Sequence, residues 1–185
     1  MNKLVIFDLD GVLLDSRDLH YDALNAALRK VDEKYVITRE EHLSKYDGLN
    51  TTKKLKMLTE DKGLPAQFYD QIWKDKQEAT FQLIPKAKFN DYAVSIMGLL
   101  KNRGWKIAVA SNSIRETVKI ALESCGAMRY VDYYVSNEDV FNPKPFPEMY
   151  WQCMTKMKAL PKNTIIIEDS HIGREGAMNS GAHLY

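Results

Sequence analysis

The stretch Leu4-Val-Ile-Phe-Asp8-Leu-Asp10-Gly11 predicts a buried strand that ends in two carboxylates. A strand has a side-chain period of two, so Asp8 and Asp10 leave it on the same side, and Gly11 allows an immediate turn. Two acids held this close repel one another unless a cation or a shared proton lies between them. One could serve as a nucleophile or metal ligand while the other moves a proton, which suits phosphoryl transfer. The simpler alternative is a turn signal at Asp10-Gly11, with Asp8 as a solvated strand end.

Three further apolar runs follow along the chain, at residues 105–110, 133–135 and 164–167. Each is short, and helical patterns flank it, as expected for strands of a parallel sheet covered by helices. We therefore predict an α/β fold with a doubly wound parallel sheet. Ligands of such sheets bind beyond the carboxyl ends of the strands, which is where the polar clusters of this chain fall.

The region from residue 16 to residue 84 has a different character. It contains no comparable apolar run, and apolar residues such as Leu19, Ala23 and Ala26 recur at helical spacing over highly charged faces. We expect an inserted helical cap over residues 16–84, with residues 1–15 and 85–185 forming the α/β core. The sequence Lys62-Gly63-Leu-Pro65 is typical of a helix stop inside this cap.

Composition limits the classes of partner. The chain has 185 residues, of which 45% are hydrophobic, and a formal net charge of +1. This balance gives no electrostatic reason to expect nucleic acid or a membrane as partner. No apolar run is long enough for a secretory core or a membrane span, so a cytoplasmic protein is expected. Cys125 and Cys153 have neither metal-ligand spacing nor the pattern of a disulfide framework.

Two polar clusters follow the first predicted strand in the chain. Ser111-Asn112-Ser113 offers hydroxyl and amide groups before a predicted helix, an arrangement suited to a phosphate, although an ordinary helix cap is the simpler interpretation. Lys144 stands between two prolines that restrict the backbone and could aim its ammonium at the site. A surface lysine in a rigid loop is the alternative.

Glu168-Asp169-Ser170 places two more acids just beyond a predicted strand. Carboxylates there could bind a hard divalent cation, whereas the alternative is a capping acid before a helix that begins near Ile172. Each cluster alone is ambiguous. Taken together with the first acid pair, they supply a nucleophile, a proton carrier, phosphate donors and a metal site.

The order of these motifs resembles the haloacid dehalogenase superfamily, in its phosphatase and phosphomutase branch with a helical cap. The match covers nearly the whole sequence and is carried by four motifs: Asp8-Leu-Asp10-Gly11-Val12, Ser111-Asn112, Lys144, and Glu168-Asp169-Ser170 with Gly173 and Gly181-Ala182. The resemblance implies a Rossmannoid core. It also implies hydrolysis of phosphate esters and disfavours carbon–halogen cleavage, because dehalogenating members lack an acid at the position of Asp10.

Roles for the site residues follow from this resemblance. Asp8 would attack phosphorus, and Asp10 would protonate the leaving oxygen and later activate water. Ser111 and Lys144 would hold the phosphoryl oxygens, with Asn112 among the substrate-binding residues. The expected cofactor, Mg²⁺, would lie among ligands from both ends of the chain: Asp8, the backbone carbonyl of Asp10, and Asp169, with Glu168 beside them.

The resemblance assigns substrate contacts to the cap residues His20, Gly48 and Lys76, in the manner of β-phosphoglucomutase-type members. A sugar-phosphate-binding arginine would be expected where Thr51 stands, and its absence weakens the mutase alternative. Simpler interpretations are an exposed helix position for His20 and a solvated lysine for Lys76. Lys53 or Lys54 could replace the arginine, but a run of solvated lysines is the simpler interpretation.

We therefore expect a Mg²⁺-dependent phosphatase of small phosphorylated metabolites, of the sugar phosphate or phosphoglycolate type. A phosphomutase is the alternative, and a non-catalytic binding protein of the same fold is a third. The small phosphorylated metabolite is the expected partner, and the protein is expected to be a monomer or weak dimer. The last residues, Gly181–Tyr185, stand where a strand is expected to begin, so either the final element is dispensable or the chain is a fragment.

Overall fold

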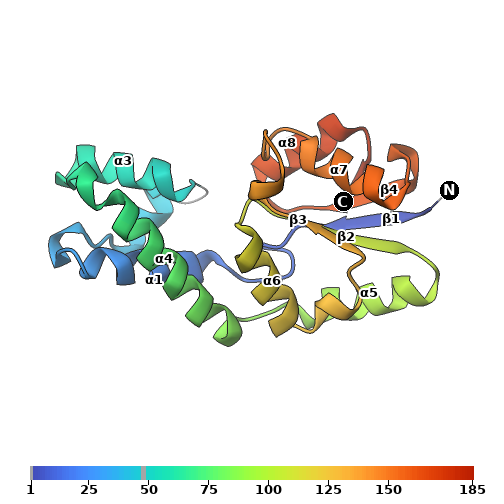
Figure 1. The fold of residues 1–185 in the computed structure, drawn as a ribbon, viewed down its shortest axis with the longest axis horizontal. Coiled ribbons are helices and arrows are strands. Elements are labelled where there is room, and N and C mark those ends of the chain that lie inside the picture. The colour runs from blue at the N-terminus through green and yellow to red at the C-terminus, as the bar shows by residue number, and fades with distance from the viewer. Residues whose placement is uncertain (1, 47–48) are drawn as a thin grey trace. The chain divides into compact units, whose positions relative to one another are not determined.

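The structure is a computed structural model that describes residues 2–46 and 49–185. It divides into two compact units, of which the first combines Met1–Ser16 with Ala87–Tyr185 and the second is Arg17–Lys86 (Figure 1). Each unit has its own hydrophobic core, and each is described separately below.

A parallel sheet of five strands forms the centre of the first unit, with the spatial order β3-β2-β1-β4-β5. The strands are β1 (Leu4–Phe7), β2 (Lys106–Ala110), β3 (Tyr133–Val135), β4 (Thr164–Ile167) and β5 (His183–Leu184). Val5 of β1 aligns with Ile107 on one side and Ile165 on the other. The predicted parallel α/β sheet is confirmed, and β1 is its central strand.

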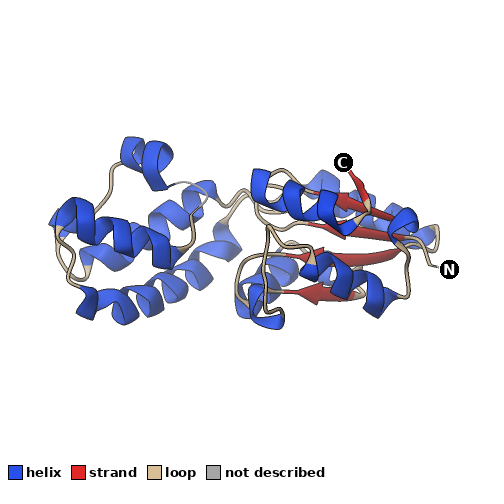
Figure 2. Cartoon of the chain, turned by 90° about the horizontal axis from the view of Figure 1, so that it is seen from above, coloured by secondary structure: helices blue, strands red, loops and turns tan. Residues whose placement is uncertain are grey.

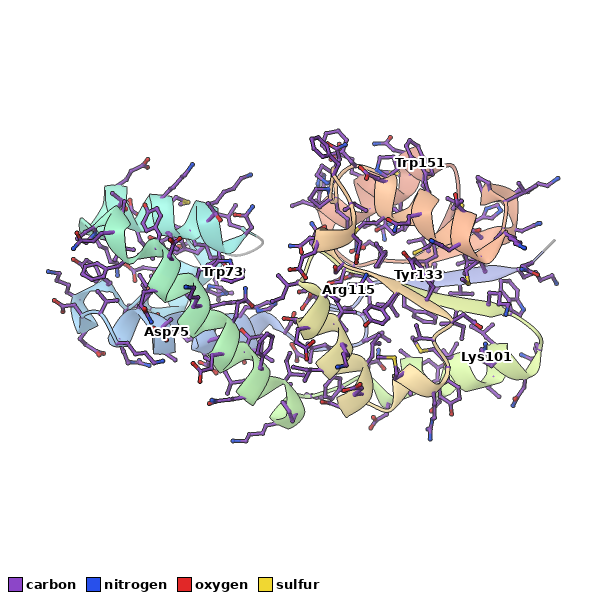
Figure 3. The ribbon with its side chains drawn as sticks, viewed as in Figure 1. Trp73, Asp75, Lys101, Arg115, Tyr133 and Trp151 are labelled. Atoms are coloured by element: carbon purple, nitrogen blue, oxygen red, sulfur yellow. The ribbon has the colours of Figure 1, made fainter. Side chains whose placement is uncertain are left out.

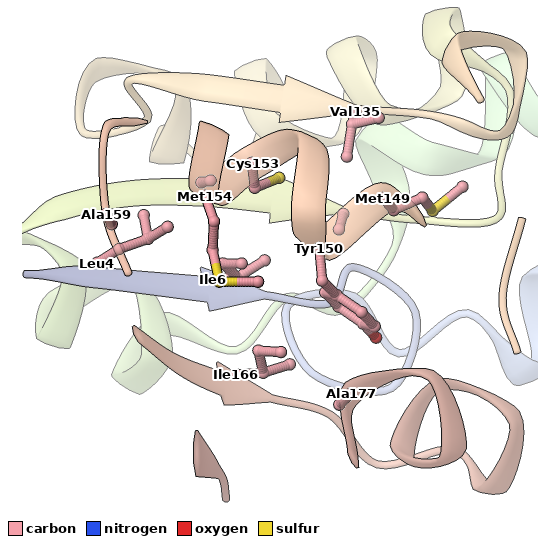
Figure 4. Packing of buried hydrophobic residues seen from close by; sticks show 12 residues of the cluster. Leu4, Ile6, Val135, Met149, Tyr150, Cys153, Met154, Ala159, Ile166 and Ala177 are labelled. Atoms are coloured by element: carbon pink, nitrogen blue, oxygen red, sulfur yellow. The ribbon is translucent and has the colours of Figure 1, made fainter. Parts of the chain in front are cut away.

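Helices lie on both faces of this sheet (Figure 2). They are α5 (Asp91–Asn102), α6 (Arg115–Ser124), α7 (Glu148–Met157) and α8 (His171–Ser180). On one face, Leu4 and Ile6 pack with Tyr150 and Cys153 of α7 and with Ala177 of α8 (Figure 4). All four residues of β1 are buried, as expected for a strand covered by helices on both sides.

Over the described residues 17–46 and 49–86, the regular secondary structure of the second unit consists of helices joined by short loops. Its α-helices are α1 (Arg17–Arg29), α2 (Arg39–Glu41), α3 (Thr51–Lys62) and α4 (Tyr69–Leu83). Leu24 and Leu28 of α1 share a core with Leu58 of α3 and Ile72 of α4. The predicted helix stop is confirmed, because α3 ends at Lys62 and Gly63 takes the left-handed conformation, with φ of 69°.

Neither cysteine forms a disulfide, and Cys153 is buried while Cys125 is half-buried. Over the part of the chain that the structure describes, no helix combines the length and the apolar character needed to cross a bilayer.

Candidate active site

The site lies at the carboxyl edge of the sheet, where three neighbouring strands end. Asp8 follows β1, Ser111 follows β2 and Glu168 follows β4. Because β2 and β4 flank β1, residues that are far apart in sequence leave the sheet side by side. This edge is the usual ligand site of open α/β sheets.

Lys144 reaches this edge from the loop after β3 and is buried, with only 4% of its side chain exposed. Its Nζ donates to Asp8 Oδ1 at 2.6 Å, to Glu168 Oε2 at 2.7 Å and to the carbonyl of Ala110 at 2.8 Å. An ammonium has three protons, so these contacts use all of them. The alternative of a surface lysine is therefore wrong, and Lys144 forms ion pairs with two of the acids.

Glu168 is the most enclosed acid of the site, since none of its side chain is exposed. Its Oε2 accepts from Lys144 and from the Tyr150 hydroxyl at 2.9 Å. Its Oε1 accepts from Ser170, through the backbone nitrogen at 3.2 Å and through Oγ at 2.8 Å. Gly173 makes room for this carboxylate, because a Cβ at that position would lie 2.0 Å from Glu168 Cδ.

Asp169 stands against the turn after β1. Gly11 has φ of +84°, and a Cβ there would lie 2.1 Å from Asp169 Oδ2. Only glycine combines this backbone conformation with so close an approach. The acids Asp8, Glu168 and Asp169 each offer a carboxylate oxygen, and these atoms lie within 4.8 Å of one another. This oxygen-rich set suits a hard divalent cation.

The Asp10 side chain is held by hydroxyl groups. Its Oδ2 accepts from Ser113 Oγ at 3.0 Å and more weakly from Ser111 Oγ at 3.4 Å. Ser111 in turn accepts the backbone N–H of Ser113 at 3.0 Å. The carboxylates of Asp8 and Asp10 thus have different surroundings, the first ion-paired and buried, the second hydroxyl-bound and partly open.

Asn112 and the start of α6 make contacts that the sequence did not predict. The Asn112 side chain accepts from the Lys144 backbone nitrogen at 3.0 Å and donates to the Lys144 carbonyl at 3.2 Å, so it fixes the lysine loop. The helix begins at Arg115, which Figure 3 labels. Ile114 before it makes no side-chain cap. The first amide of the helix donates to Glu138 Oε2 at 2.7 Å. The serine cluster therefore does not cap this helix, and a protein carboxylate already binds its first amide.

The cap ahead of α8 is also a serine. Ser170 Oγ accepts from the backbone nitrogen of Gly173 at 3.0 Å, and the helix begins at His171. The alternative that Glu168 or Asp169 serves as the capping acid is therefore wrong. Both acids remain at the sheet edge.

Negative charge exceeds positive charge in this cluster. Burial raises the pKa of Asp8 to about 7, and the neighbouring acids Glu168 and Asp10 add to the effect against the opposing charge of Lys144. Burial alone would lower the pKa of Lys144, but the Asp8 and Glu168 carboxylates raise it above its ordinary value. The pKa of Asp169 is raised by burial and then by Glu168. A proton or a divalent cation would relieve this excess of acids.

In the helical unit, His20 and Lys76 lie together, with 3.5 Å between His20 Nδ1 and Lys76 Nζ. Lys76 is 9% exposed and Lys54 7%, so the expectation of solvated lysines is wrong for both, whereas Lys53 is exposed. His20 is half-buried. Gly48, the third predicted cap residue, lies outside the described residues.

Three residues of the site make contacts to the acids that were not assigned to them from the sequence. Ser113 is two positions beyond Ser111, and that spacing is a signal that could have found it. Ser170 precedes a predicted helix, so the sequence indicates only a helix cap at this position. Tyr150 looks like any core aromatic on an amphipathic helix, and no pattern shows that its hydroxyl reaches an acid.

Comparisons with known proteins place the chain in a family. The sequence profile of the haloacid dehalogenase-like hydrolases matches residues 5–185. A phosphorylated carbohydrates phosphatase of Thermotoga maritima is 28% identical over 183 residues, covering 97% of this chain and 82% of the relative.

Solved structures agree in fold. A Thermotoga maritima protein, provisionally named a β-phosphoglucomutase, has a TM-score of 0.78 at 25% identity, covering 99% of this chain and 84% of its own. CbbY of Rhodobacter sphaeroides, solved in complex with phosphate, has a TM-score of 0.88 at 20% identity, covering 100% and 85%. The resemblance carried by the four motifs is confirmed, and the chain belongs to the haloacid dehalogenase-like hydrolase family.

Proposed function

We propose that the protein is a Mg²⁺-dependent phosphatase of small phosphorylated metabolites, which acts through an aspartyl-phosphate on Asp8. The observation that carries the proposal is the position of Asp8, ion-paired to Lys144 at 2.6 Å within a cluster of three acids. A phosphorylated sugar is the preferred substrate class, because the relative from Thermotoga maritima is named for phosphorylated carbohydrates.

The donor set of the site fits magnesium. Mg²⁺ prefers oxygen ligands and is commonly bound through one or two carboxylates together with substrate phosphate. Asp8, Asp169 and the backbone carbonyl of Asp10 would hold the ion. When bound, it would supply positive charge against the oxygens of the transferring phosphoryl group.

In the first step, an Asp8 carboxylate oxygen attacks phosphorus and the ester P–O bond breaks. The Asp10 carboxyl group donates its proton to the departing oxygen, so the alcohol leaves neutral and Asp8 becomes phosphorylated. Lys144 stabilises the charge that spreads over the phosphoryl oxygens. Because all three Lys144 protons are bound before substrate arrives, one of these hydrogen bonds would be shared with the phosphate.

In the second step, the ionised Asp10 accepts a proton from a water molecule as that water attacks phosphorus. The bond between Asp8 and phosphorus breaks, which releases inorganic phosphate and restores the Asp8 carboxylate. Asp10 is protonated again and ready for the next substrate. Ser113 and Ser111 hold Asp10 by its Oδ2 atom, which supports a defined position for this proton carrier.

The helical unit, Arg17–Lys86, is proposed to be a cap that chooses the organic part of the substrate. A phosphomutase is the second candidate, and the His20–Lys76 contact at 3.5 Å favours it as a pair able to exchange protons with a sugar hydroxyl. Thr51 stands where the mutase pattern has an arginine for a second phosphate. For this reason the phosphatase is preferred.

The proposal is tested by assaying the purified protein against hexose phosphates, phosphoglycolate and nucleotides, with and without Mg²⁺. We expect release of inorganic phosphate only with Mg²⁺ and no release by the Asp8→Asn variant, which should keep the parent's circular dichroism spectrum. Formation of an isomeric hexose phosphate without phosphate release would establish the mutase instead. Parent-like turnover by Asp8→Asn would show that the nucleophile is wrongly assigned.

A further inference from the structure

Tyr150 belongs to the hydrophobic core and to the charged cluster at once. Tyr150 is fully buried, and Figure 4 shows its ring among the core side chains of α7 and the sheet. Its hydroxyl lies 2.9 Å from Glu168 Oε2 and 3.1 Å from the carbonyl of Gly173. A hydroxyl has one proton, and the charged carboxylate is the stronger acceptor for it.

The ring of Tyr150 also meets the cation of the cluster. Lys144 Nζ lies 5.4 Å from the ring centroid, within the range of a cation–π contact. The same side chain therefore touches both members of the Lys144–Glu168 ion pair, whose atoms are 2.7 Å apart. Both members are almost fully buried, so little water is available to replace a lost contact.

Glu168 has no acceptor position left over. A carboxylate offers about four lone-pair positions. In Glu168 they are met by Lys144, by the Tyr150 hydroxyl, and by the nitrogen and Oγ of Ser170. A cation that bound directly to Glu168 would have to displace one of these donors. Two other acids have fewer donors around them. In Asp8, Lys144 binds only one of the two carboxylate oxygens, and Asp169 is more exposed.

We propose that Tyr150 is a positioning residue, whose hydroxyl and ring hold Glu168 against Lys144 and so keep Glu168 off the metal ion. The acids would then have different roles. Glu168 fixes Lys144 at Asp8, and Asp8 and Asp169 supply the side-chain ligands. The inference rests on the proposed function and adds to it a role for Tyr150, which contacts both members of the ion pair.

The test is the Tyr150→Phe variant, which removes one oxygen and keeps the ring in the core. Tyr133→Phe is the matched control, because the Tyr133 hydroxyl also has a partner on α7, Gln152 at 2.8 Å. Among the described residues, no hydrogen bond joins Tyr133 to Asp8, Glu168 or Asp169. Circular dichroism and thermal unfolding verify that both variants are folded. Mg²⁺ binding is measured by titration calorimetry without substrate, and kcat and KM are measured on the best ester of the panel.

For Tyr150→Phe we expect kcat about tenfold lower with KM within about twofold of the parent, because Lys144 is less firmly held. We expect Mg²⁺ to bind severalfold more tightly, since Glu168 regains a free lone pair. Tyr133→Phe should match the parent in both measurements. Unchanged kcat in Tyr150→Phe would overturn the positioning role, and unchanged or weaker Mg²⁺ binding would overturn the claim that Tyr150 keeps Glu168 from the ion.

The two proposals can fail separately. If the parent hydrolyses no ester but binds Mg²⁺, the phosphatase proposal fails, while calorimetry on Tyr150→Phe still decides the role of the hydroxyl. If the parent binds no Mg²⁺, both proposals are overturned.

Discussion

The Lys144 ammonium donates to the Asp8 carboxylate at 2.6 Å, although 136 positions separate the two residues in the chain. Both side chains are buried, with 4% and 7% exposed, and the same ammonium also meets Glu168. A buried cation shared by two acids orders the site before any substrate arrives. It also makes the site sensitive to any change in its charge balance.

Loss of this cation should affect both stability and turnover. Lys144→Met keeps most of the length of the side chain but leaves Asp8 and Glu168 without their partner. Breaking a buried pair in this way costs about 3–5 kcal/mol, so we expect the free energy of unfolding at pH 8 without Mg²⁺ to fall by about that amount. Turnover should fall by at least about a hundredfold.

Urea unfolding and steady-state kinetics measure the two effects of Lys144→Met. Lys156→Met, on the exposed face of α7, is the control and should leave both unchanged. A Lys144→Met variant as stable as the parent in the absence of Mg²⁺ would contradict the charge balance described here.

Gly11→Ala should weaken metal binding. The new Cβ would lie 2.1 Å from Asp169 Oδ2, so this carboxylate must leave the position in which it stands within reach of the other acids. Gly104→Ala is the control for backbone strain, because Gly104 has a similar φ of +77° but an added Cβ there would have nothing within 4 Å. We expect about tenfold weaker Mg²⁺ binding by calorimetry in Gly11→Ala alone, on the scale of a disturbed metal-site contact. Equal affinities in the two variants would argue against Asp169 as a ligand.

Gly173→Ala should disturb Glu168 from the opposite side. The Cβ of the new alanine would lie 2.0 Å from Glu168 Cδ. The Glu168 carboxylate is buried and held by four donors, so it cannot move aside without losing hydrogen bonds. Overpacking of this kind costs about 1–3 kcal/mol. We expect thermal unfolding to report that loss, together with a lower kcat.

Gly98→Ala is the control for Gly173→Ala, since both glycines lie inside helices. The nearest atom to a Cβ at Gly98 is the Tyr130 hydroxyl at 3.2 Å, and alanine favours the helix. We expect a stability change within about 1 kcal/mol and an unchanged kcat. A Gly173→Ala variant that behaved like Gly98→Ala would mean that Glu168 tolerates displacement.

The stabilisation given by Mg²⁺ should grow as pH rises. Burial raises the pKa of Asp8 from 3.8 to about 7 in the folded protein without metal. An acid with a raised folded pKa contributes stability that is complete below its unfolded pKa and is lost as pH rises through the folded one. The metal-free protein therefore loses this contribution between about pH 4 and pH 7.

A bound cation would offset the loss, because Mg²⁺ binds the ionised carboxylate. Thermal unfolding at pH 5 and pH 8 should show a larger Mg²⁺-induced rise in Tm at the higher pH. Asp8→Asn, which has no proton to lose at this position, should show a smaller dependence. A rise in Tm that is equal at both pH values in the parent would exclude Asp8 as the titrating ligand.

Local sequence was enough for the parts of the fold that depend on period and composition. The four apolar residues of β1 predict a strand that is covered on both faces, and all four are buried. Gly63 ends α3 for a local reason as well, since it alone takes the left-handed conformation there without strain.

Tertiary structure decided which groups meet. Lys144, Asn112 and Glu168 each had a plausible local interpretation, as surface lysine, phosphate ligand and helix cap. Only the packing of α7 and the order of β2, β1 and β4 brings the lysine to both acids and turns Asn112 toward the Lys144 backbone. The burial of Lys76 likewise depends on how the helices of the second unit pack.

The sequence by itself determined the strands, the helices and the kinds of chemical group at the sheet edge, because these follow from spacing within a few residues. The tertiary structure alone decided the partners of those groups. A hydrogen bond of under 3 Å between residues more than a hundred positions apart depends on the whole sheet and its helices, and no local pattern encodes that distance.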